Sequence, residues 1–257
     1  MSEAWALRLY QKSPLKRDKV AAILSVLGGI EGKRCLDLGS DNGVVSLLLR
    51  QQGGSWASGD LTSETVEAIR ALVGSDVHLV NGRRLPFRDA EFDLVVVADM
   101  IEHIEDEDSF VGEIARILRP GGRLVVNTPH ARDTLLRRLR LRLGQTDEKH
   151  GHVRAGYTRD SLGALLQSRF EVRAARTYTK AFSEVIDTAM QWGLERLGKK
   201  GSKKGVVVTG GDLDRHARMF TAYRVVFPFV WMFSRLDRLL PLNDGYRLLM
   251  VATRKAS

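Results

Sequence analysis

The stretch 34–43, Arg-Cys-Leu-Asp-Leu-Gly-Ser-Asp-Asn-Gly, constrains the fold of this chain more than any other. It predicts a short buried strand that ends at Asp37 and breaks into a glycine turn, from which a helix over 44–51 begins. Gly39 permits a tight turn with close approach of the backbone to a ligand, and Gly43 lets the helix start against the sheet. Turns of this kind bind nucleotides, so we expect a nucleotide-binding α/β protein.

The spacing of the glycines indicates which class of nucleotide this turn would bind. If Gly39 is the first glycine of the dinucleotide fingerprint, Asp41 and Val44 stand where the second and third glycines belong, which argues against NAD. The pattern acidic-x-Gly-x-x-x-Gly, formed by Asp37, Gly39 and Gly43, resembles motif I of the class I S-adenosylmethionine (SAM) methyltransferases. That family commonly has glycine at the middle position as well, and here the residue is Asp41.

Composition describes a soluble chain with an excess of positive charge. Its 257 residues suffice for one α/β domain with an embellishment. Cys35 is the single cysteine, so no internal disulfide forms and a reducing compartment is expected. We expect a cytoplasmic protein, because the first twenty residues lack the apolar core of a signal peptide and no apolar run reaches the roughly 18 to 20 residues that span a bilayer. The net charge of +9 suggests an anionic partner.

A second acidic residue follows the next predicted strand, 55–59. Asp60 lies 23 residues after Asp37, near the offset at which α/β nucleotide-binding folds place a carboxylate that accepts both ribose hydroxyls. Thr62 already supplies a capping oxygen for the helix predicted over 64–73, so Asp60 is not needed as a cap. Asp60 is therefore predicted to bind a ribose.

The third predicted strand, 77–80, leads into a loop that resembles the adenine-binding loop of the family. The family often has an acid there, which accepts a hydrogen bond from the adenine amino group, and the amide oxygen of Asn81 can accept the same bond. Leu-Pro-Phe at 85–87 then precedes an apolar strand up to Val97, of the kind buried on both faces of a parallel sheet.

The resemblance continues along the chain. A helix capped by Asp106 or Asp108 is predicted to end at a turn, Leu-Arg-Pro-Gly-Gly at 118–122, before a fifth apolar strand; this turn is a specific mark of the class I family. Residues 34–128 thus resemble the SAM-binding half of the small-molecule methyltransferases. The implied fold is α/β, a Rossmann-like class I methyltransferase sandwich with a seven-stranded, mostly parallel sheet and helices on both faces. The implied parts are an N-terminal helical cap (1–30), the SAM-binding core (31–177), a helical, aromatic-rich insertion between the last two strands (178–244) and the final strand (245–257).

The resemblance implies SAM as the cofactor and S-adenosylhomocysteine (SAH) as the product. The glycine loop would contact the methionine end, Asp60 the ribose, the loop after the third strand the adenine, and Asp99 the methionine amino group, while Asp37 would orient the glycine loop through backbone amides. The cofactor-binding residues implied in this way are Asp37, Gly39, Ser40, Gly43, Asp60, Leu61, Asn81, Gly82, Arg83, Asp99 and Met100.

The segment after the fourth strand is where chemistry is expected, because ligands in open α/β sheets bind at the carboxyl ends of strands. Asp99, Glu102 and His103 match the acid-x-x-Glu-His pattern that belongs to a divalent-metal site in ubiquinone-pathway O-methyltransferases and small-RNA 2′-O-methyltransferases. Such a metal would orient a substrate hydroxyl and lower its pKa. Glu-His also occurs in methyltransferases without a metal, where the histidine packs near the cofactor sulfur or acts as a base. We favour this metal-free interpretation.

Two more side chains join His103 as catalytic candidates. In related enzymes a His-x-x-x-aromatic segment precedes the crossover helix, predicted here over 160–167, and faces the substrate. His152 or Tyr157 could therefore supply a base or a hydrogen bond to the substrate. The alternative for His152 is a solvent-exposed loop position.

Two segments bear on partners. The run 131–142 holds five arginines against one acid, and could form a basic amphipathic helix for a membrane surface or phosphate, or simply a solvated face. Six of the eighteen aromatic residues lie between Phe220 and Phe233, in the insertion. This insertion could be a lid over an apolar substrate, a dimer interface or an interfacial membrane anchor. We favour the lid, with contact to anionic membrane as a secondary role, and leave a homodimer open.

The predicted function is SAM-dependent methyl transfer to a small, apolar or lipid-linked acceptor, with oxygen favoured as the acceptor atom. The Asn-Pro-Pro-Tyr motif of many amino-directed nucleic-acid enzymes is absent, since Asp-Met-Ile-Glu at 99–102 occupies its place. An RNA methyltransferase is an alternative because the chain is basic, although no separate RNA-binding motif is evident. A catalytically inactive methyltransferase-like binding protein is the other alternative.

Overall fold

The computed structural model describes residues 2–132, 152–179 and 245–256, together with residues 138, 185 and 232. Almost all of the predicted insertion 178–244 and of the arginine-rich run 131–142 therefore lies outside the described residues. No helix of the described ranges is long and apolar enough to cross a membrane.

The described ranges alternate strands and helices, as the sequence predicts. The strands are β1 (Arg34–Leu38), β2 (Ser55–Asp60), β3 (Val77–Leu79), β4 (Phe92–Ala98), β5 (Leu118–Pro129), β6 (Phe170–Tyr178) and β7 (Arg247–Arg254). The helices are α1 (Ser2–Gln11), α2 (Pro14–Leu24), α3 (Val44–Arg50), α4 (Ser63–Val73), the 3-10 turn η1 (Ile101–His103), α5 (Glu107–Ile117) and α7 (Arg159–Leu166).

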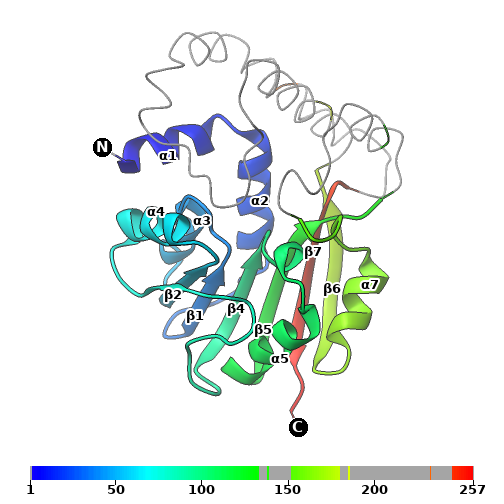
Figure 1. Ribbon diagram of the computed structural model, residues 1–257. Coiled ribbons are helices and arrows are strands. Elements are labelled where there is room, and N and C mark those ends of the chain that lie inside the picture. The colour runs from blue at the N-terminus through cyan, green and yellow to red at the C-terminus, as the bar shows by residue number, and fades with distance from the viewer. Residues whose placement is uncertain are drawn as a thin grey trace.

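The strands form one seven-stranded sheet in the order β3-β2-β1-β4-β5-β7-β6. The four pairs among β1 to β5 are parallel, and β7 runs antiparallel to both β5 and β6 (Figure 1). The predicted mostly parallel sheet is confirmed. Because the order reverses between β1 and β4, their carboxyl ends are the expected ligand-binding edge.

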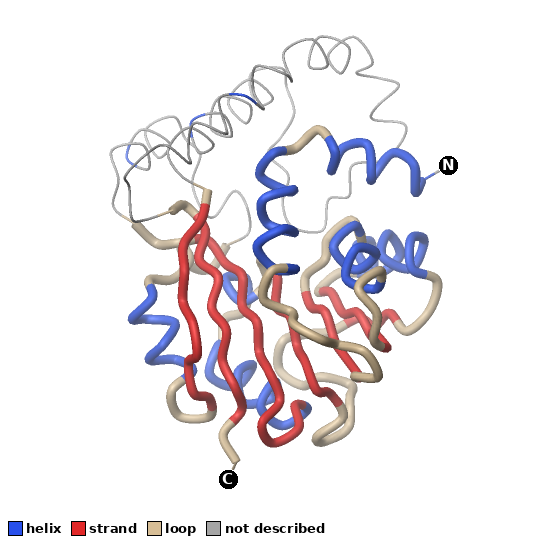
Figure 2. Tube along the Cα trace, turned by 180° about the vertical axis from the view of Figure 1, so that it is seen from behind, coloured by secondary structure: helices blue, strands red, loops and turns tan. Residues whose placement is uncertain are grey.

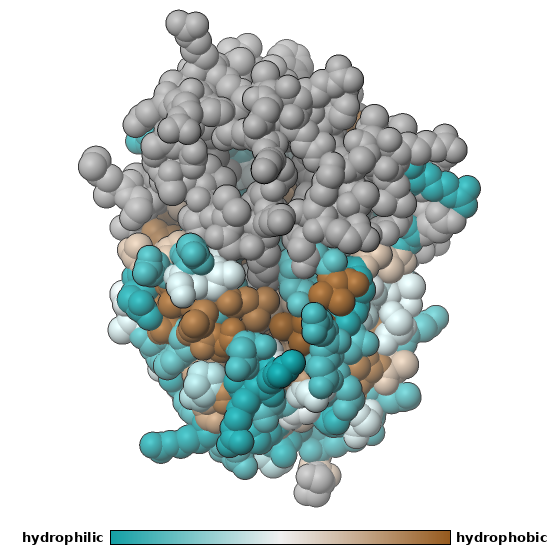
Figure 3. All heavy atoms as spheres, viewed as in Figure 1, coloured by the Kyte–Doolittle hydropathy of each residue, from teal (hydrophilic) through white to brown (hydrophobic). Residues whose placement is uncertain are grey.

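Helices cover both faces of the sheet (Figure 2). One apolar core lies between the sheet and α5 and α7, and a second lies beneath α2 and α3. The central strand β4 contributes buried residues to both cores, which is why its sequence is a continuous apolar run. On the face shown in Figure 3, an apolar band crosses the middle, and the part below it is mainly hydrophilic.

The predicted helix starts hold at two positions. The Thr62 side chain accepts from the backbone N–H of Thr65 at the start of α4, and Asp106, rather than Asp108, caps α5 by accepting from Ser109. These caps satisfy N–H groups that have no partner inside the helix.

Two local predictions need correction. The N-terminal cap predicted as helical over 1–30 ends at Leu24 and consists of two helices, because Ser13 caps a new helix and Pro14 stands at its first position. The turn predicted at 118–122 is part of β5. Leu118 pairs with Phe92, and after a register shift Arg123 pairs with Leu94, so the Pro-Gly-Gly segment bulges out of the ladder.

Candidate cofactor and active site

The glycine loop between β1 and α3 packs too closely for larger residues. A Cβ atom on Gly39 would lie 2.3 Å from the carbonyl oxygen of Ala98 and 2.8 Å from the Cβ of Met100. A Cβ on Gly43 would lie 2.8 Å from the Cα of Ile69, and both glycines have positive φ. The loop therefore passes directly over the end of β4 and against α4.

This loop is bound to Asp60 through the backbone of Asp41. Asp41 has a φ of 57°, a left-handed conformation that aspartate tolerates better than most residues. Its backbone N–H donates to Asp60 Oδ2 over 3.0 Å, and the N–H of Leu61 donates to Asp60 Oδ1 over 2.7 Å. The Asp60 carboxylate is fully buried at the end of β2, so it fixes the loop that lies above it.

Asp37 has a different role from the predicted one. Its carboxylate accepts from the Ser46 hydroxyl over 2.5 Å and 2.9 Å, and Arg50 Nη1 lies 3.8 Å away. Burial raises the pKa of Asp37 to about 6, although Ser46 and Arg50 act in the opposite direction. The Ser40 hydroxyl also faces α3, where it accepts from the N–H of Ser46. Asp37 thus anchors helix α3 and does not orient the loop through backbone amides.

The loop after β3 forms a tight turn of its own. Asn81 Oδ1 accepts from the backbone N–H groups of Arg83 and Arg84 over 3.0 Å and 3.1 Å. The amide oxygen predicted to accept from adenine is therefore engaged within the loop, and the Asn81 amide nitrogen is the group that remains for a ligand. A Cβ on Gly82 would lie 2.6 Å from Ile104 Cδ1, so this turn packs directly on the segment after β4.

Asp99 lies at the centre of a polar cluster after β4. Its carboxylate accepts from the ammonium group of Lys19 on α2 (3.0 Å), from Arg247 at the start of β7 (2.7 Å) and from the amide of Asn127 on β5 (2.9 Å). The hydroxyl of Tyr178, the last residue of β6, donates to the same asparagine. Met100, the neighbour of Asp99, is buried in the core, and Leu61 packs against that core.

The cations of α2 are not among the site residues predicted from the sequence. Lys16 is exposed on α2, where partial loss of hydration lowers the pKa of its ammonium group, while Asp41 and Asp99 act in the opposite direction. Lys16 and Lys19 are three residues apart and share one face of the helix. That spacing was visible in the sequence, but nothing in it placed this helix over the glycine loop.

A second cluster joins η1 to the segment before α7. Glu102, His103 and His152 each offer a ligand atom, and these atoms lie within 4.8 Å of one another. The rings of His103 and His152 meet edge to face with centroids 4.7 Å apart, and Thr128 donates to the buried Glu102 carboxylate. The metal-ligand set considered from the sequence is thus altered, because His152 joins the cluster and Asp99 binds Lys19 and Arg247.

Tyr157 is a support for this turn rather than part of the histidine pair. Its hydroxyl donates to Glu107 and accepts from Arg154, which also donates to the carbonyl oxygens of Ile101 and Ile104. Burial and the Glu107 carboxylate raise the pKa of Tyr157 far above its ordinary value. Because both contacts of the Tyr157 hydroxyl lie within the protein, His103 and His152 are the stronger candidates for a base.

Comparison with known proteins points to the same fold as the strand order and the loop geometry. A family model described as a methyltransferase domain matches residues 36–126, the segment from β1 into β5. The segment 36–126 is thus a methyltransferase domain of the class I, SAM-dependent type. This family implies SAM as its cofactor, as the sequence predicted.

Relatives and solved structures extend this comparison. Proteins named ubiquinone biosynthesis O-methyltransferase from Alkalilimnicola ehrlichii and Xylella fastidiosa are 29% and 30% identical over 126 and 131 residues, which is 47% of this chain and 50% of each relative. A SAM-dependent methyltransferase of Thermotoga maritima is 19% identical with a TM-score of 0.59, covering 98% of this chain and 94% of that chain. The chain thus spans about half the length of the curated relatives it matches, and the structural likeness concerns the fold.

Proposed function

We propose that this methyltransferase domain transfers the methyl group of SAM to an oxygen atom of a small, apolar or lipid-linked acceptor. The observation that carries the proposal is that the glycine loop, Asp60 and the Asp99 cluster lie at the same edge of the sheet as the paired histidines. The relatives named for ubiquinone biosynthesis support oxygen as the acceptor atom.

The residues at this edge fit the cofactor chemically. The methionine end of SAM carries both an ammonium and a carboxylate, and α2 brings Lys16 and Lys19 beside the acids Asp41 and Asp99. Both signs of charge are therefore present where a zwitterion would bind. Asp60, at the end of β2, would accept from the ribose hydroxyls, and the turn at Asn81 would contact the adenine.

His103 and His152 supply the acid-base chemistry in this proposal. When bound, SAM supplies an electrophilic methyl group, so an oxygen acceptor needs a base that removes its proton. Both imidazoles are half-buried, and Glu102, which offers an oxygen within 4.8 Å of a nitrogen of each, would stabilise a protonated ring. We favour this metal-free mode. The same three side chains form a donor set that suits a divalent cation, which would instead orient and acidify the acceptor hydroxyl.

The first experiment is calorimetric titration of the cofactor-stripped protein with SAM and SAH, with EDTA and with added Mg²⁺. Micromolar binding supports the cofactor site, and its absence under both conditions would favour the inactive, methyltransferase-like binding protein.

Transfer of labelled methyl to phenolic acceptors then tests the reaction. His103→Ala should lower kcat by about 10²- to 10⁴-fold with little change in SAM affinity, as removal of a general base does. Activity that persists in EDTA supports the metal-free mode, and activity restored by Mg²⁺ or Zn²⁺ supports the cation.

The basic charge of the chain motivates one competing acceptor, RNA. Binding to RNA that falls steeply with salt, accompanied by methyl transfer to RNA, would replace the small-molecule proposal. A lipid-linked acceptor also implies contact with a membrane. Co-sedimentation with anionic vesicles tests that contact independently of catalysis.

A further inference from the structure

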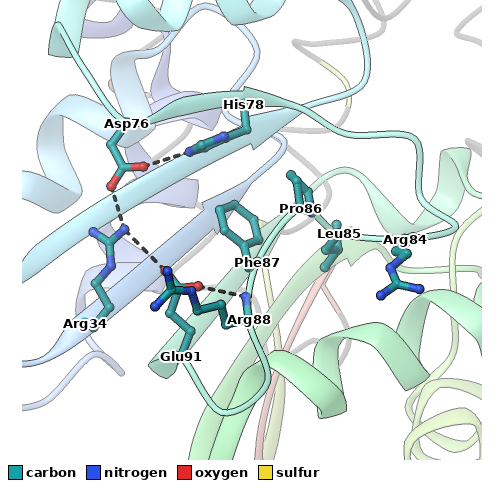
Figure 4. A pocket seen from close by; sticks show the side chains of 9 residues that line it. All are labelled: Arg34, Asp76, His78, Arg84, Leu85, Pro86, Phe87, Arg88 and Glu91. Atoms are coloured by element: carbon teal, nitrogen blue, oxygen red, sulfur yellow. Dashed lines mark hydrogen bonds and ion pairs between the residues drawn. The ribbon is translucent and has the colours of Figure 1, made fainter.

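An open pocket of about 430 Å³ lies away from the cofactor site. Arg34, which opens β1, and Asp76, which precedes β3, form one side of it, and residues 84–88 form the other (Figure 4). The glycine loop follows the opposite end of β1, so the pocket is at the amino end of the strands. None of the candidate cofactor-binding or catalytic residues lines it.

The wall at 84–88 is held rigidly from α5. Arg116 donates to the carbonyl oxygens of Leu85 (3.0 Å) and Phe87 (2.9 Å), and Glu113 accepts from the N–H of Leu85 over 2.8 Å. Because the backbone of this segment is fixed by two charged side chains, the pocket exists before any ligand arrives. A preformed site costs a ligand less ordering free energy than a flexible one.

The acids of the pocket are already neutralised. Arg34 forms ion pairs with Asp76 (2.6 Å) and Glu91 (3.6 Å), and Asp76 also contacts His78 Nε2 over 2.8 Å (Figure 4). The Arg34 guanidinium lies 5.4 Å from the centre of the Phe92 ring. The charge of Arg34 is therefore neutralised by acids of the pocket itself, and its role is structural.

Arg84 and Arg88 are different. Both are exposed, and neither guanidinium makes an ion pair with any residue of the described ranges. They lie on opposite sides of Phe87 (Figure 4), and Pro86 beside it is also exposed. The pocket thus presents two separated cations with an apolar floor between them. Arginine is the residue best suited to bind carboxylates, because its fork of donors matches them.

We propose that this pocket docks an acidic peptide segment of a partner protein. An apolar side chain of that segment lies on Pro86 and Phe87, and a carboxylate on each side of it binds Arg84 and Arg88. A polyanion fits less well, because three arginines against two acids give the lining a net charge of only +1. A second copy of this chain is disfavoured by its net charge of +9.

Backbone amide NMR of the full chain tests the proposal with a defined probe, the peptide Ac-Ser-Glu-Leu-Glu-Ser-NH₂. We expect millimolar binding with amide shifts concentrated at Arg84, Leu85, Phe87 and Arg88. Replacing both glutamates by glutamine, or the leucine by glycine, should weaken binding. Arg84→Ala and Arg88→Ala should each weaken it about two- to fivefold, as loss of an exposed ion pair does. Arg173→Ala removes the same charge from β6 and should change nothing.

Several results would overturn the proposal. These are no shifts at 20 mM peptide, equal shifts with the glutamine peptide, or equal weakening by Arg173→Ala. Binding of a single-stranded RNA oligonucleotide that is lost in Arg84→Ala and Arg88→Ala would assign the pocket to nucleic acid instead. Self-association that the same two substitutions abolish, measured by sedimentation velocity, would assign it to a second copy.

Discussion

The two halves of the cofactor edge are held together in different ways. At the end of β2, Asp60 accepts hydrogen bonds from the backbone of Asp41 and Leu61, which are 19 residues and one residue away. At the end of β1, Asp37 binds Ser46, nine residues away. The β1–β2 half is thus closed by its own loop and the helix that follows it.

The β4 half is assembled from distant segments. Among the described residues, Asp99 binds Lys19, Asn127 and Arg247, which come from α2, β5 and β7 and lie 80, 28 and 148 residues away. Substitutions in the β1–β2 half should therefore affect mainly its own loop and helix. Substitutions in the β4 half should disturb contacts between α2, β4, β5 and β7. The following predictions test this difference.

Asp37→Asn should produce the largest change, in the pH dependence of stability. Because burial raises the pKa of Asp37 to about 6 from an ordinary value of 3.8, the folded protein binds this proton more tightly than the unfolded chain. The stability contributed by this group is full below about pH 4 and is lost as the pH rises through about 6. The free energy of unfolding of the wild type, relative to Asp37→Asn, should fall by about 3 kcal/mol across this range.

Urea denaturation of both proteins at pH 4, 5, 6 and 7 measures this difference. Asp108→Asn is a matched control, since Asp108 is an exposed carboxylate that pairs with Arg169. A difference that stays constant with pH would show that the Asp37 carboxylate is ionised throughout and that local contacts fully offset its burial.

Asp60→Ala should weaken SAM binding by about 100-fold, because hydrogen bonds to a charged group are worth about 1.5 to 3 kcal/mol. The carboxylate also holds the Asp41 N–H, so part of the loss would come from a looser loop. Asp60→Asn keeps one acceptor oxygen and should retain an intermediate affinity. Calorimetry gives the affinities, and circular dichroism verifies the fold. Unchanged affinity in Asp60→Ala would remove Asp60 from the site.

Sequence reasoning succeeded where the determinants are local. The cap at Thr62 binds Thr65, and Asp60 binds the N–H of Asp41 within one strand-helix-strand unit, so motif spacing was sufficient to place them. Gly39 and Gly43 pack against the more distant Ala98 and Ile69, but their spacing alone marked the loop. The apolar run of β4 likewise predicts a strand buried on both faces.

The Asp99 cluster could not be predicted in the same way. Lys19 and Arg247 flank opposite ends of the core in sequence, and only the packing of α2 and the antiparallel return of β7 bring them together. The oxygen of Asn81 was assigned to adenine because its own turn could not be foreseen. The contact of His152 with Glu102 and His103 could not be predicted either, since a loop position carries no spacing signal.

Lys19→Gln tests whether α2 is part of the cofactor site. We expect about tenfold weaker binding of SAH, since one charge-assisted contact to the carboxylate is lost. Binding of 5′-methylthioadenosine, which lacks the amino-acid end, should not change. Lys33→Gln, a lysine beside β1 at its other end, is the charge-matched control. Equal weakening of both ligands would mean that Lys19 only supports Asp99 structurally.

Asp41→Gly should have the smallest effect and concerns the local half. Asp41 occupies a left-handed conformation in which glycine costs less, while its role through Asp60 depends on the backbone N–H, which glycine keeps. SAM affinity should therefore stay within about twofold, and the free energy of unfolding should change by less than about 1 kcal/mol. Calorimetry and thermal denaturation measure the two quantities. A tenfold loss of affinity would show that the Asp41 carboxylate acts on the ligand itself, together with Lys16, and the local half would then depend on α2 as much as the Asp99 cluster does.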